Sequence, residues 1–298
     1  PMIECKSCGW VPHCVNCDVS LTYHKYHNQL VCHYCGYTIQ LPPHCPECQS
    51  AELKMMGFGT EKVEEEIASL FPAAKVERLD FDTARTRTAY ERIISDFEKG
   101  KTQILIGTQM LSKGLDFGNV SVVGILNADN LMNYPDFRAH ERAFQLMVQV
   151  SGRAGRRDKR GTVVLQTSQP EHPLIRMVQH FAYREMVRLQ LSERSMFRYP
   201  PYYRLIVLVL RSRNETVLQE MSTIYAEKLR VRLGERVLGP VTPPVTRVQT
   251  LHIKKIVLKI EIAAAIAPVR EILEAIHSEM QRYLPFKQLI VHYDIDPA

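Results

Sequence analysis

Eight cysteines lie in the first 48 residues of this 298-residue chain, and none follows them. They form four pairs with the spacing C-x-x-C, which are Cys5/Cys8, Cys14/Cys17, Cys32/Cys35 and Cys45/Cys48. Two such pairs supply four thiolates, the ligand set of a tetrahedral zinc ion with Zn–S bonds of about 2.3 Å. A secreted disulfide scaffold is rarely joined to so long a cysteine-free body, so the pattern indicates thiols in a reducing compartment. We therefore predict two zinc ions in a module over residues 1–50.

The residues between the second and third pairs indicate how the pairs combine. Residues 18–31 contain two apolar stretches around the turn-like His27-Asn28, and a hairpin there brings the inner pairs together. This favours a nested arrangement, with Cys5, Cys8, Cys45 and Cys48 around zinc 1 and Cys14, Cys17, Cys32 and Cys35 around zinc 2. A cross-brace stays open as an alternative, as does a sequential arrangement, which must fold residues 9–13 around one ion. Closed four-thiolate sites leave no position for water, so we expect structural metals.

Composition excludes several classes of protein. The chain is 45% hydrophobic and 23% charged, and no apolar run approaches the roughly 18–20 residues needed to cross a bilayer. We therefore expect no membrane partner. The start at Pro1-Met2 lacks the basic-then-apolar layout of a secretory signal and suggests a piece of a longer protein. Lys and Arg exceed Asp and Glu by six, mostly after residue 180, which mildly favours a polyanionic partner there.

From 51 to 179, short apolar strands alternate with amphipathic helices. The pattern predicts helices over 87–99 and 138–150, and strands over 75–79, 103–107, 121–126 and 162–166. Such alternation is typical of an α/β layer fold with a parallel sheet.

The last third, 180–298, has a different pattern. We predict strands over 203–210, 245–250, 253–262 and 288–293, with helices over 215–233 and 269–283. The order βαββαβ is that of a ferredoxin-like, split βαβ domain of the α+β class.

Two stretches of the α/β segment have the residues of a phosphate site. Gly107-Thr108-Gln-Met-Leu-Ser-Lys-Gly114-Leu-Asp116 follows an expected buried strand, and ligands collect at such strand ends. Gln149-Val-Ser-Gly152-Arg153-Ala-Gly155-Arg156 ends an expected helix. Two arginines three residues apart suit the γ-phosphate of a nucleotide, whose developing charge a guanidinium stabilises.

Together these stretches resemble motifs V and VI in the second RecA-like lobe of superfamily 2 helicases. With the cysteine array, further motifs narrow the resemblance to the primosomal replication-restart helicase family, PriA. These motifs are Gly57-Phe-Gly-Thr60-Glu61, Trp10-Val-Pro-His-Cys14, Leu21-Thr-Tyr-His24, Cys32-His-Tyr-Cys35-Gly36 and Asn127-Ala-Asp129. The resemblance covers nearly the whole chain and is strongest up to about residue 180. Beyond that it rests on the order of elements, on Phe197-Arg-Tyr-Pro-Pro201 and on Leu238-Gly-Pro240.

The resemblance implies three parts: a double-zinc module over 1–50, a RecA-like second helicase lobe over 51–179, and a C-terminal DNA- and partner-binding domain over 180–298. The family nests its zinc pairs. The resemblance also implies roles for single residues. Arg156 matches the arginine finger, and Arg153, Gln149 and Gly114 match positions of the ATP site. Asp116 matches the residue that couples the nucleotide to motor closure, and Thr108 and Thr60 match contacts to DNA phosphate.

The implied function is ATP- and Mg²⁺-dependent 3′→5′ DNA unwinding. Members of the family act at stalled forks in the bacterial cytoplasm and restart replication by assembling the primosome. The implied partners are branched or forked DNA, single-stranded DNA-binding protein, and the proteins of the primosome that load the replicative helicase. Between Pro244 and Ile253, where relatives are expected to have a basic, aromatic-rich hairpin, this sequence differs, so we assign no DNA contact there.

The chain has only one side of an ATP site. Gly100-Lys101-Thr102 imitates the end of a phosphate loop, but Ser95 stands where the motif needs glycine, and an expected helix precedes it instead of a strand. No Asp-Glu pair follows a strand. ATP hydrolysis needs the phosphate loop, the magnesium carboxylates and the arginine finger in one cleft, so we expect the chain alone to be inactive. The alternatives are a non-catalytic zinc-containing adaptor for DNA or protein, and another superfamily 2 DNA translocase.

Overall fold

The computed structural model describes residues 2–57, 59–80, 83–108, 111, 117–155 and 161–297. The chain divides into two compact units. One unit combines residues 1–57 with 194–298, and the other comprises residues 58–193. The three domains predicted from the sequence, over 1–50, 51–179 and 180–298, remain a proposal.

The first part of the discontinuous unit, residues 2–57, is called the cysteine-rich module below. Strand β1 (Met2–Cys5) pairs antiparallel with β5 (Leu53–Met56), so the two ends of the module close on each other. Between them, β2 (Thr22–His24), β3 (Gln29–Val31) and β4 (Thr38–Gln40) form an antiparallel meander. The connection between β2 and β3 is the 3-10 turn Lys25–His27, after which Asn28 has a left-handed backbone with φ of 49°. The hairpin predicted around His27-Asn28 is therefore confirmed.

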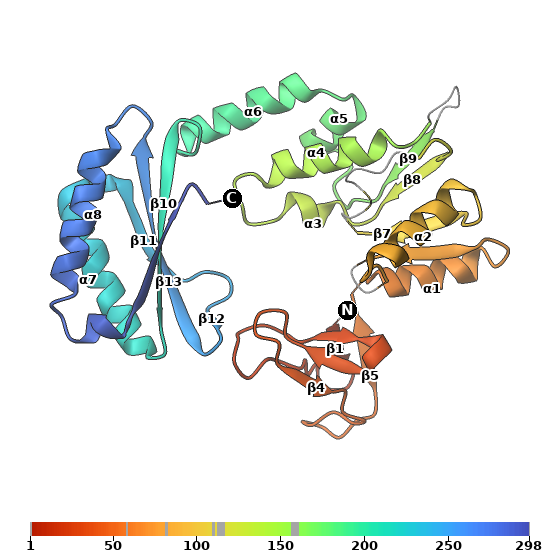
Figure 1. Cartoon of the computed structure of the whole chain (residues 1–298), viewed down its shortest axis with the longest axis horizontal. Coiled ribbons are helices and arrows are strands. Elements are labelled where there is room, and N and C mark those ends of the chain that lie inside the picture. The colour runs from red at the N-terminus through yellow and green to blue at the C-terminus, as the bar shows by residue number, and fades with distance from the viewer. Residues whose placement is uncertain are drawn as a thin grey trace. The chain divides into compact units, whose positions relative to one another are not determined.

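The second part of that unit is the C-terminal sheet domain. Its elements in chain order are β10 (Tyr203–Ser212), α7 (Glu215–Leu233), a 3-10 turn (Gly234–Arg236), β11 (Val237–Val241), β12 (Arg247–Val248), β13 (Leu251–Glu261), α8 (Ile266–Met280), a second 3-10 turn (Pro285–Gln288) and β14 (Ile290–Ile295). The strand order is β11-β13-β10-β14, with antiparallel neighbours, and β12 also pairs with β13. Helices α7 and α8 lie on one face of this sheet (Figure 1). This is the predicted split βαβ arrangement.

One strand of this domain was predicted in the wrong place. The prediction put a strand at 245–250, but the edge strand of the sheet is β11, and β12 covers only two residues. Gly239 and Pro240 concealed β11 in the sequence, because both residues disfavour regular strands. An edge strand tolerates them at an irregularity, and the pairing with β13 shifts register between Leu238 and Val241. A Cβ atom at Gly239 would lie 2.8 Å from the carbonyl oxygen of Lys255, so the close approach of the two strands requires glycine.

The second unit contains the predicted alternation of strands and helices. Its elements are α1 (Thr60–Leu70), β6 (Val76–Leu79), α2 (Arg87–Glu98), β7 (Ile104–Gly107), β8 (Val122–Ile125), α3 (Asp129–Met132), α4 (Ala139–Ser151), β9 (Thr162–Leu165), α5 (Pro173–Gln179) and α6 (Tyr183–Met196), whose last residues belong to the first unit. Strand β6 pairs parallel with β7, and β8 pairs parallel with β9. The parallel pairing is thus confirmed, as two separate two-stranded sheets among the described residues.

The apolar stripes of the helices explain the cores of this unit. Buried residues of α4 and α5, with Met186 of α6, form one cluster, and Ile93 of α2 packs with Leu79 and Phe117 in another. In the described part of the chain, no helix has both the length and the apolar character needed to cross a membrane.

Candidate zinc centres and nucleotide-binding residues

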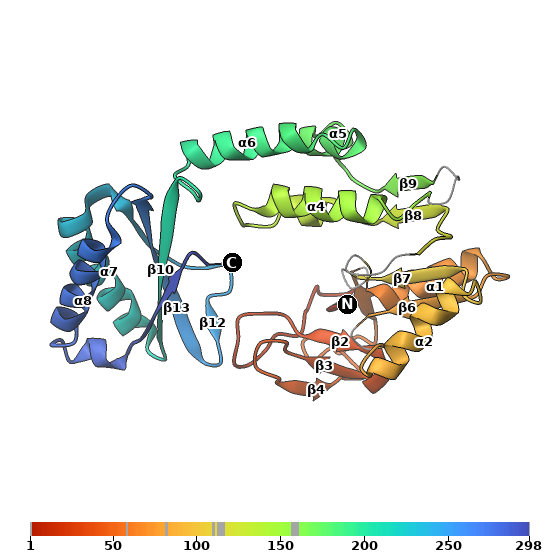
Figure 2. The same cartoon turned by 45° about the horizontal axis from the view of Figure 1, so that its top comes forward.

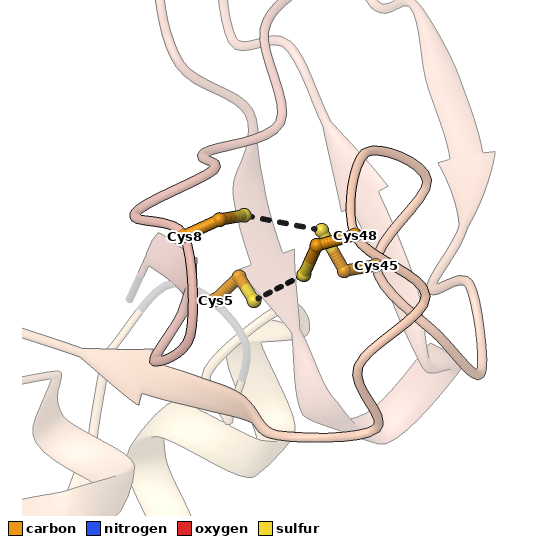
Figure 3. A group of neighbouring side chains, drawn as sticks. All are labelled: Cys5, Cys8, Cys45 and Cys48. Atoms are coloured by element: carbon orange, nitrogen blue, oxygen red, sulfur yellow. Dashed lines mark hydrogen bonds between the residues drawn. The ribbon is translucent and has the colours of Figure 1, made fainter.

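The outer cysteine cluster joins the two ends of the cysteine-rich module. Cys5 is the last residue of β1, and the Cys45/Cys48 turn lies in the loop that leads to β5. The Sγ atoms of Cys5 and Cys48 are 3.6 Å apart, as are those of Cys8 and Cys45 (Figure 3). All four sulfurs lie within 4.8 Å of one another. The β1–β5 pairing therefore positions this cluster.

The inner cluster is positioned by the β2–β3 hairpin. It comprises Cys14, Cys17, Cys32 and Cys35, again with all four sulfurs within 4.8 Å. The Sγ atoms of Cys14 and Cys35 are 3.5 Å apart. The backbone N–H of Asn16 donates to Sγ of Cys14 at 3.4 Å. The structure thus brings the pairs together in the nested arrangement.

Each C-x-x-C pair forms a tight turn, which we call a knuckle. In every knuckle the N–H of the first cysteine donates to the carbonyl oxygen five residues later, at 2.8–3.0 Å. These four hydrogen bonds run from Cys5 to Trp10, from Cys14 to Val19, from Cys32 to Tyr37 and from Cys45 to Ser50. The four knuckles share this hydrogen bond, and each directs two sulfurs to one point.

The two four-cysteine clusters fit two zinc ions. A tetrahedron with Zn–S bonds of about 2.3 Å has S···S edges of about 3.8 Å, close to the separations of 3.5–3.6 Å. A disulfide would require a separation of about 2.05 Å, and all eight cysteines are free. Four sulfurs would complete the coordination of each ion and leave no place for a reacting water, so we expect zinc to have a structural role here.

The pKa values show why four thiolates need a cation. Burial raises the pKa of Cys5, but hydrogen bonds from backbone amides and neighbouring thiols outweigh it and lower the pKa to about 7. The amide of Trp10 favours the Cys8 thiolate, yet burial and the three surrounding thiols raise the pKa of Cys8 to about 12. The inner cluster has the same division, with the pKa of Cys35 lowered to about 7 and that of Cys17 raised, mainly by burial, to about 12. A divalent cation bound to all the sulfurs removes this mutual penalty.

The nucleotide-site prediction concerns the end of α4. Gln149 is exposed in the last turn of this helix, and Arg153 is half-buried just beyond its C-cap residue Gly152. The chain then returns to the strand region, because the N–H of Gly155 donates to the carbonyl of Val120 at 3.0 Å. Arg156, Asp116 and Gly114 lie outside the described residues. The roles of all five residues stay predictions.

The two threonines predicted to contact DNA lie in different surroundings. Thr108 is exposed directly after β7. Thr60 is the first residue of α1, and its hydroxyl donates to the carboxylate of Asp80 at 2.6 Å. Asp80 is buried and also pairs with Arg78 at 3.2 Å. The Thr60 hydroxyl is thus engaged inside its own unit, and its contact with DNA remains a prediction, as does that of Thr108.

Two other sequence features have structural explanations. Gly100 follows α2 with a left-handed φ of 69°, and the hydroxyl of Thr102 donates to Glu77 at 2.6 Å, so Gly100-Lys101-Thr102 is a helix ending and not a phosphate loop. Asp129 accepts hydrogen bonds from the hydroxyl of Thr167 at 2.5 Å and from the N–H and hydroxyl of Ser168 at 2.8 Å. These bonds lower the pKa of Asp129 and fix the start of α3 to the segment after β9.

The sequence reasoning missed one set of residues at the inner cluster. The β12–β13 hairpin of the C-terminal sheet domain contacts it, and the N–H of Gln249 donates to Sγ of Cys17 at 3.3 Å. The two residues are 232 positions apart in the chain. No local pattern in the sequence indicates such a contact.

Family models match most of the chain in three consecutive ranges. The PriA DNA helicase Cys-rich region domain matches residues 14–39, the helicase conserved C-terminal domain matches 49–158, and the primosomal protein N C-terminal domain matches 195–298. The first and third ranges lie in the cysteine-rich module and the C-terminal sheet domain. The second lies mainly in the unit of residues 58–193, hereafter the helicase lobe.

Curated relatives match over the same length. The chain is 38% identical over 298 residues to the replication restart protein PriA of Bacillus subtilis (strain 168), which covers 99% of this chain and 36% of that protein. It is 40% identical over 253 residues to the PriA protein of Synechocystis sp., covering 83% of this chain and 30% of that protein. The PriA protein of Treponema pallidum is 36% identical over 298 residues, covering 99% of this chain and 44% of that protein. The chain, which spans less than half the length of each of these three relatives, therefore belongs to the PriA family.

Proposed function

We propose that this chain supplies the second half of an ATP-dependent 3′→5′ DNA helicase, which recognises stalled replication forks and restarts replication by primosome assembly. The match of residues 49–158 to a helicase C-terminal domain, between two domains particular to PriA, is the observation that carries the proposal. In this proposal a longer protein provides a first lobe, which holds the phosphates and magnesium of ATP. The protein acts in the bacterial cytoplasm.

The helicase lobe contributes positive charge to the ATP site. Arg156 acts as the arginine finger, and Arg153 and Gln149 position the phosphates from the end of α4. Gly114 contributes to the binding of ATP, and Asp116 couples the bound nucleotide to closure of the motor. The expected contribution of a guanidinium is electrostatic, because phosphoryl transfer leaves charge on the γ-phosphate oxygens that a fixed cation stabilises. Thr60 and Thr108 contact DNA phosphates of the strand along which the motor moves.

The other two parts serve recognition and support. The cysteine-rich module holds two structural zinc ions, and the C-terminal sheet domain binds branched or forked DNA, single-stranded DNA-binding protein and helicase-loading proteins of the primosome. The basic excess of the last third supports a polyanionic partner.

The test compares the 298-residue chain with a chimera in which it replaces the matching region of the Bacillus subtilis relative. We expect no ATP hydrolysis stimulated by forked DNA from the chain alone, and stimulated hydrolysis from the chimera. Arg156→Ala in the chimera should lower kcat by about 10³-fold or more, whereas Arg157→Ala, which removes the same charge one residue away, should have little effect. Zinc content and circular dichroism establish that each variant is folded.

Two outcomes would overturn the proposal. Turnover by the isolated chain that survives Arg156→Ala and repurification would show that no first lobe is needed. A folded chimera that binds forked DNA but hydrolyses no more ATP than the Arg156→Ala variant and the isolated chain would favour the non-catalytic adaptor.

A further inference from the structure

Three of the four knuckles are closed by their own backbone. In each of them the residue four positions after the first cysteine has a left-handed φ and donates its N–H to the backbone carbonyl oxygen of that cysteine. These bonds run from Gly9 to Cys5, from Gly36 to Cys32 and from Gln49 to Cys45, at 2.8–2.9 Å, and the three donors have φ values of 75°, 77° and 60°. These knuckles need no other part of the chain to fix their shape.

The Cys14/Cys17 knuckle is different. The equivalent residue is Asp18, whose N–H donates to the carbonyl of Arg247 in β12 at 3.0 Å. The N–H of Thr250 donates to the carbonyl of Asn16 at 2.8 Å, and the N–H of Gln249 donates to the ligand sulfur of Cys17. This knuckle is closed by a hairpin from the C-terminal sheet domain.

Side chains of the same hairpin reinforce the closure. The guanidinium of Arg247 donates to Oδ1 of Asp18 at 3.2 Å through two nitrogens and to the carbonyl of Val15 at 3.3 Å. The hydroxyl of Thr246 donates to the other carboxylate oxygen of Asp18. Val248 packs against the buried core of the cysteine-rich module. Figure 2 shows the tip at β12 beside a loop of the module.

The backbone conformation of this hairpin's turn is unfavourable for the residues that form it. Val248 pairs with Leu251, so Gln249 and Thr250 are the two central residues, with φ of 51° and 67°. A two-residue hairpin with both φ values positive ordinarily uses Asn-Gly, and a β-branched threonine is a poor fit for this backbone. Such a conformation persists where surrounding contacts impose it, and here the amides of both residues donate to the knuckle.

We propose that residues 246–251 complete the inner zinc site in its outer shell and thereby dock the C-terminal sheet domain onto the cysteine-rich module. Four thiolates around a zinc ion leave a net charge of about −2. The N–H of Gln249 offsets part of that charge at the Cys17 sulfur, as outer-shell partners do at metal sites. Arg247 supports the site by holding the knuckle through Asp18 and the carbonyl of Val15. Zinc binding at the inner cluster and docking of the domain therefore strengthen each other, since such a coupling is reciprocal.

The first test measures zinc release from the full 298-residue chain to a colorimetric chelator. Arg247→Ala should release one of the two zinc ions about tenfold faster or more, with the second ion unaffected. Arg236→Ala is the matched control, because Arg236 pairs with Glu261 at 2.8 Å in the same domain, away from the clusters. The double variant Gln249→Asn/Thr250→Gly keeps the amides in an easier turn and should release zinc at the parental rate. Metal analysis of the parent checks separately that it holds two zinc ions.

The second test measures whether the hairpin stays docked on the inner cluster, and it does not depend on enzymatic activity. Cys35→Ser removes an inner ligand and Cys8→Ser an outer one, and hydrogen exchange is followed in peptides covering 246–252. We expect exchange there to rise with Cys35→Ser and to stay at the parental level with Cys8→Ser. Equal zinc release from Arg247→Ala and Arg236→Ala, or equal exchange in the two cysteine variants, would overturn the proposal.

Discussion

The hydrophobic core cluster of the cysteine-rich module has seven buried members among the described residues, and three of them are cysteines. Eighteen are buried in the core of the C-terminal sheet domain, and none is a cysteine. The strands of the module are three or four residues long, whereas β10 and β13 have ten and eleven residues. The two regions belong to one compact unit, but the module has the smaller apolar core, so we expect it to need metal in order to fold.

The difference teaches where each region gets its stability. In the sheet domain, α7 and α8 cover long strands, and removal of apolar surface from water provides the stability. In the module, two metal sites replace that contribution. The contact between them at residues 246–251 joins a metal-dependent region to a metal-independent one.

Removal of zinc should have the largest effect, because it should unfold the cysteine-rich module and leave the sheet domain folded. Structural zinc contributes roughly 10–16 kcal/mol per site in isolated zinc peptides, more than the whole stability of many domains. A strong chelator should abolish hydrogen-exchange protection in β1, β3 and β5 while β10 and α7 keep theirs. Zinc content is measured on the same samples. If β1 and β5 stayed protected in zinc-free protein, apolar packing and not metal would hold the module.

Truncation of the sheet-domain core should have the opposite selectivity and a smaller effect. Leu208 is fully buried in β10, and Leu208→Ala should lower the free energy of unfolding of that domain by about 2–5 kcal/mol, since it leaves a cavity. Zinc content should remain at the parental level. Val231→Ala, on the exposed side of α7, is the control and should change stability by less than about 0.5 kcal/mol. Urea unfolding followed by circular dichroism measures both.

A pH change should give the smallest effect and should act on the sheet domain through His277. Its Nδ1 lies 3.1 Å from the Tyr293 hydroxyl, and burial lowers the pKa of His277 below its usual 6.5. The unfolded chain therefore binds a proton more readily. The contribution of His277 to stability is complete above pH 6.5 and declines as the pH falls below it. His277→Gln should remove this dependence.

The measurement is an NMR titration of the His277 ring, supported by urea midpoints at pH 7.5 and 5.5. A titration midpoint at or above 6.5, or an equal pH dependence in parent and variant, would show that the ring is not protected as the structure indicates.

Helix boundaries were predictable where local signals agree with packing. The expected helix 215–233 coincides with α7, because Asn214 accepts a hydrogen bond from the N–H of Val217 as N-cap and Gly234 follows the last residue. The boundaries of β6, β7, β8 and β9 were also predicted within a residue or two, because short apolar runs between amphipathic helices are typical of the strands of a parallel sheet. The edge strand β11 was missed, because Gly239 and Pro240 disfavour a strand by themselves. They are tolerated where β11 pairs irregularly with β13, which the local sequence does not reveal.

The sequence by itself indicated the chemistry of this protein: four C-x-x-C pairs that suit metal, and an arginine motif that predicts a phosphate-binding site. These properties are local, since ligand type and spacing fix what a short segment can bind. Only the tertiary structure decided how the cysteine pairs group and which distant hairpin closes the knuckle at Asp18. The contacts of that hairpin join residues more than 200 positions apart, and their energy comes from packing and charge that appear only once the chain has folded.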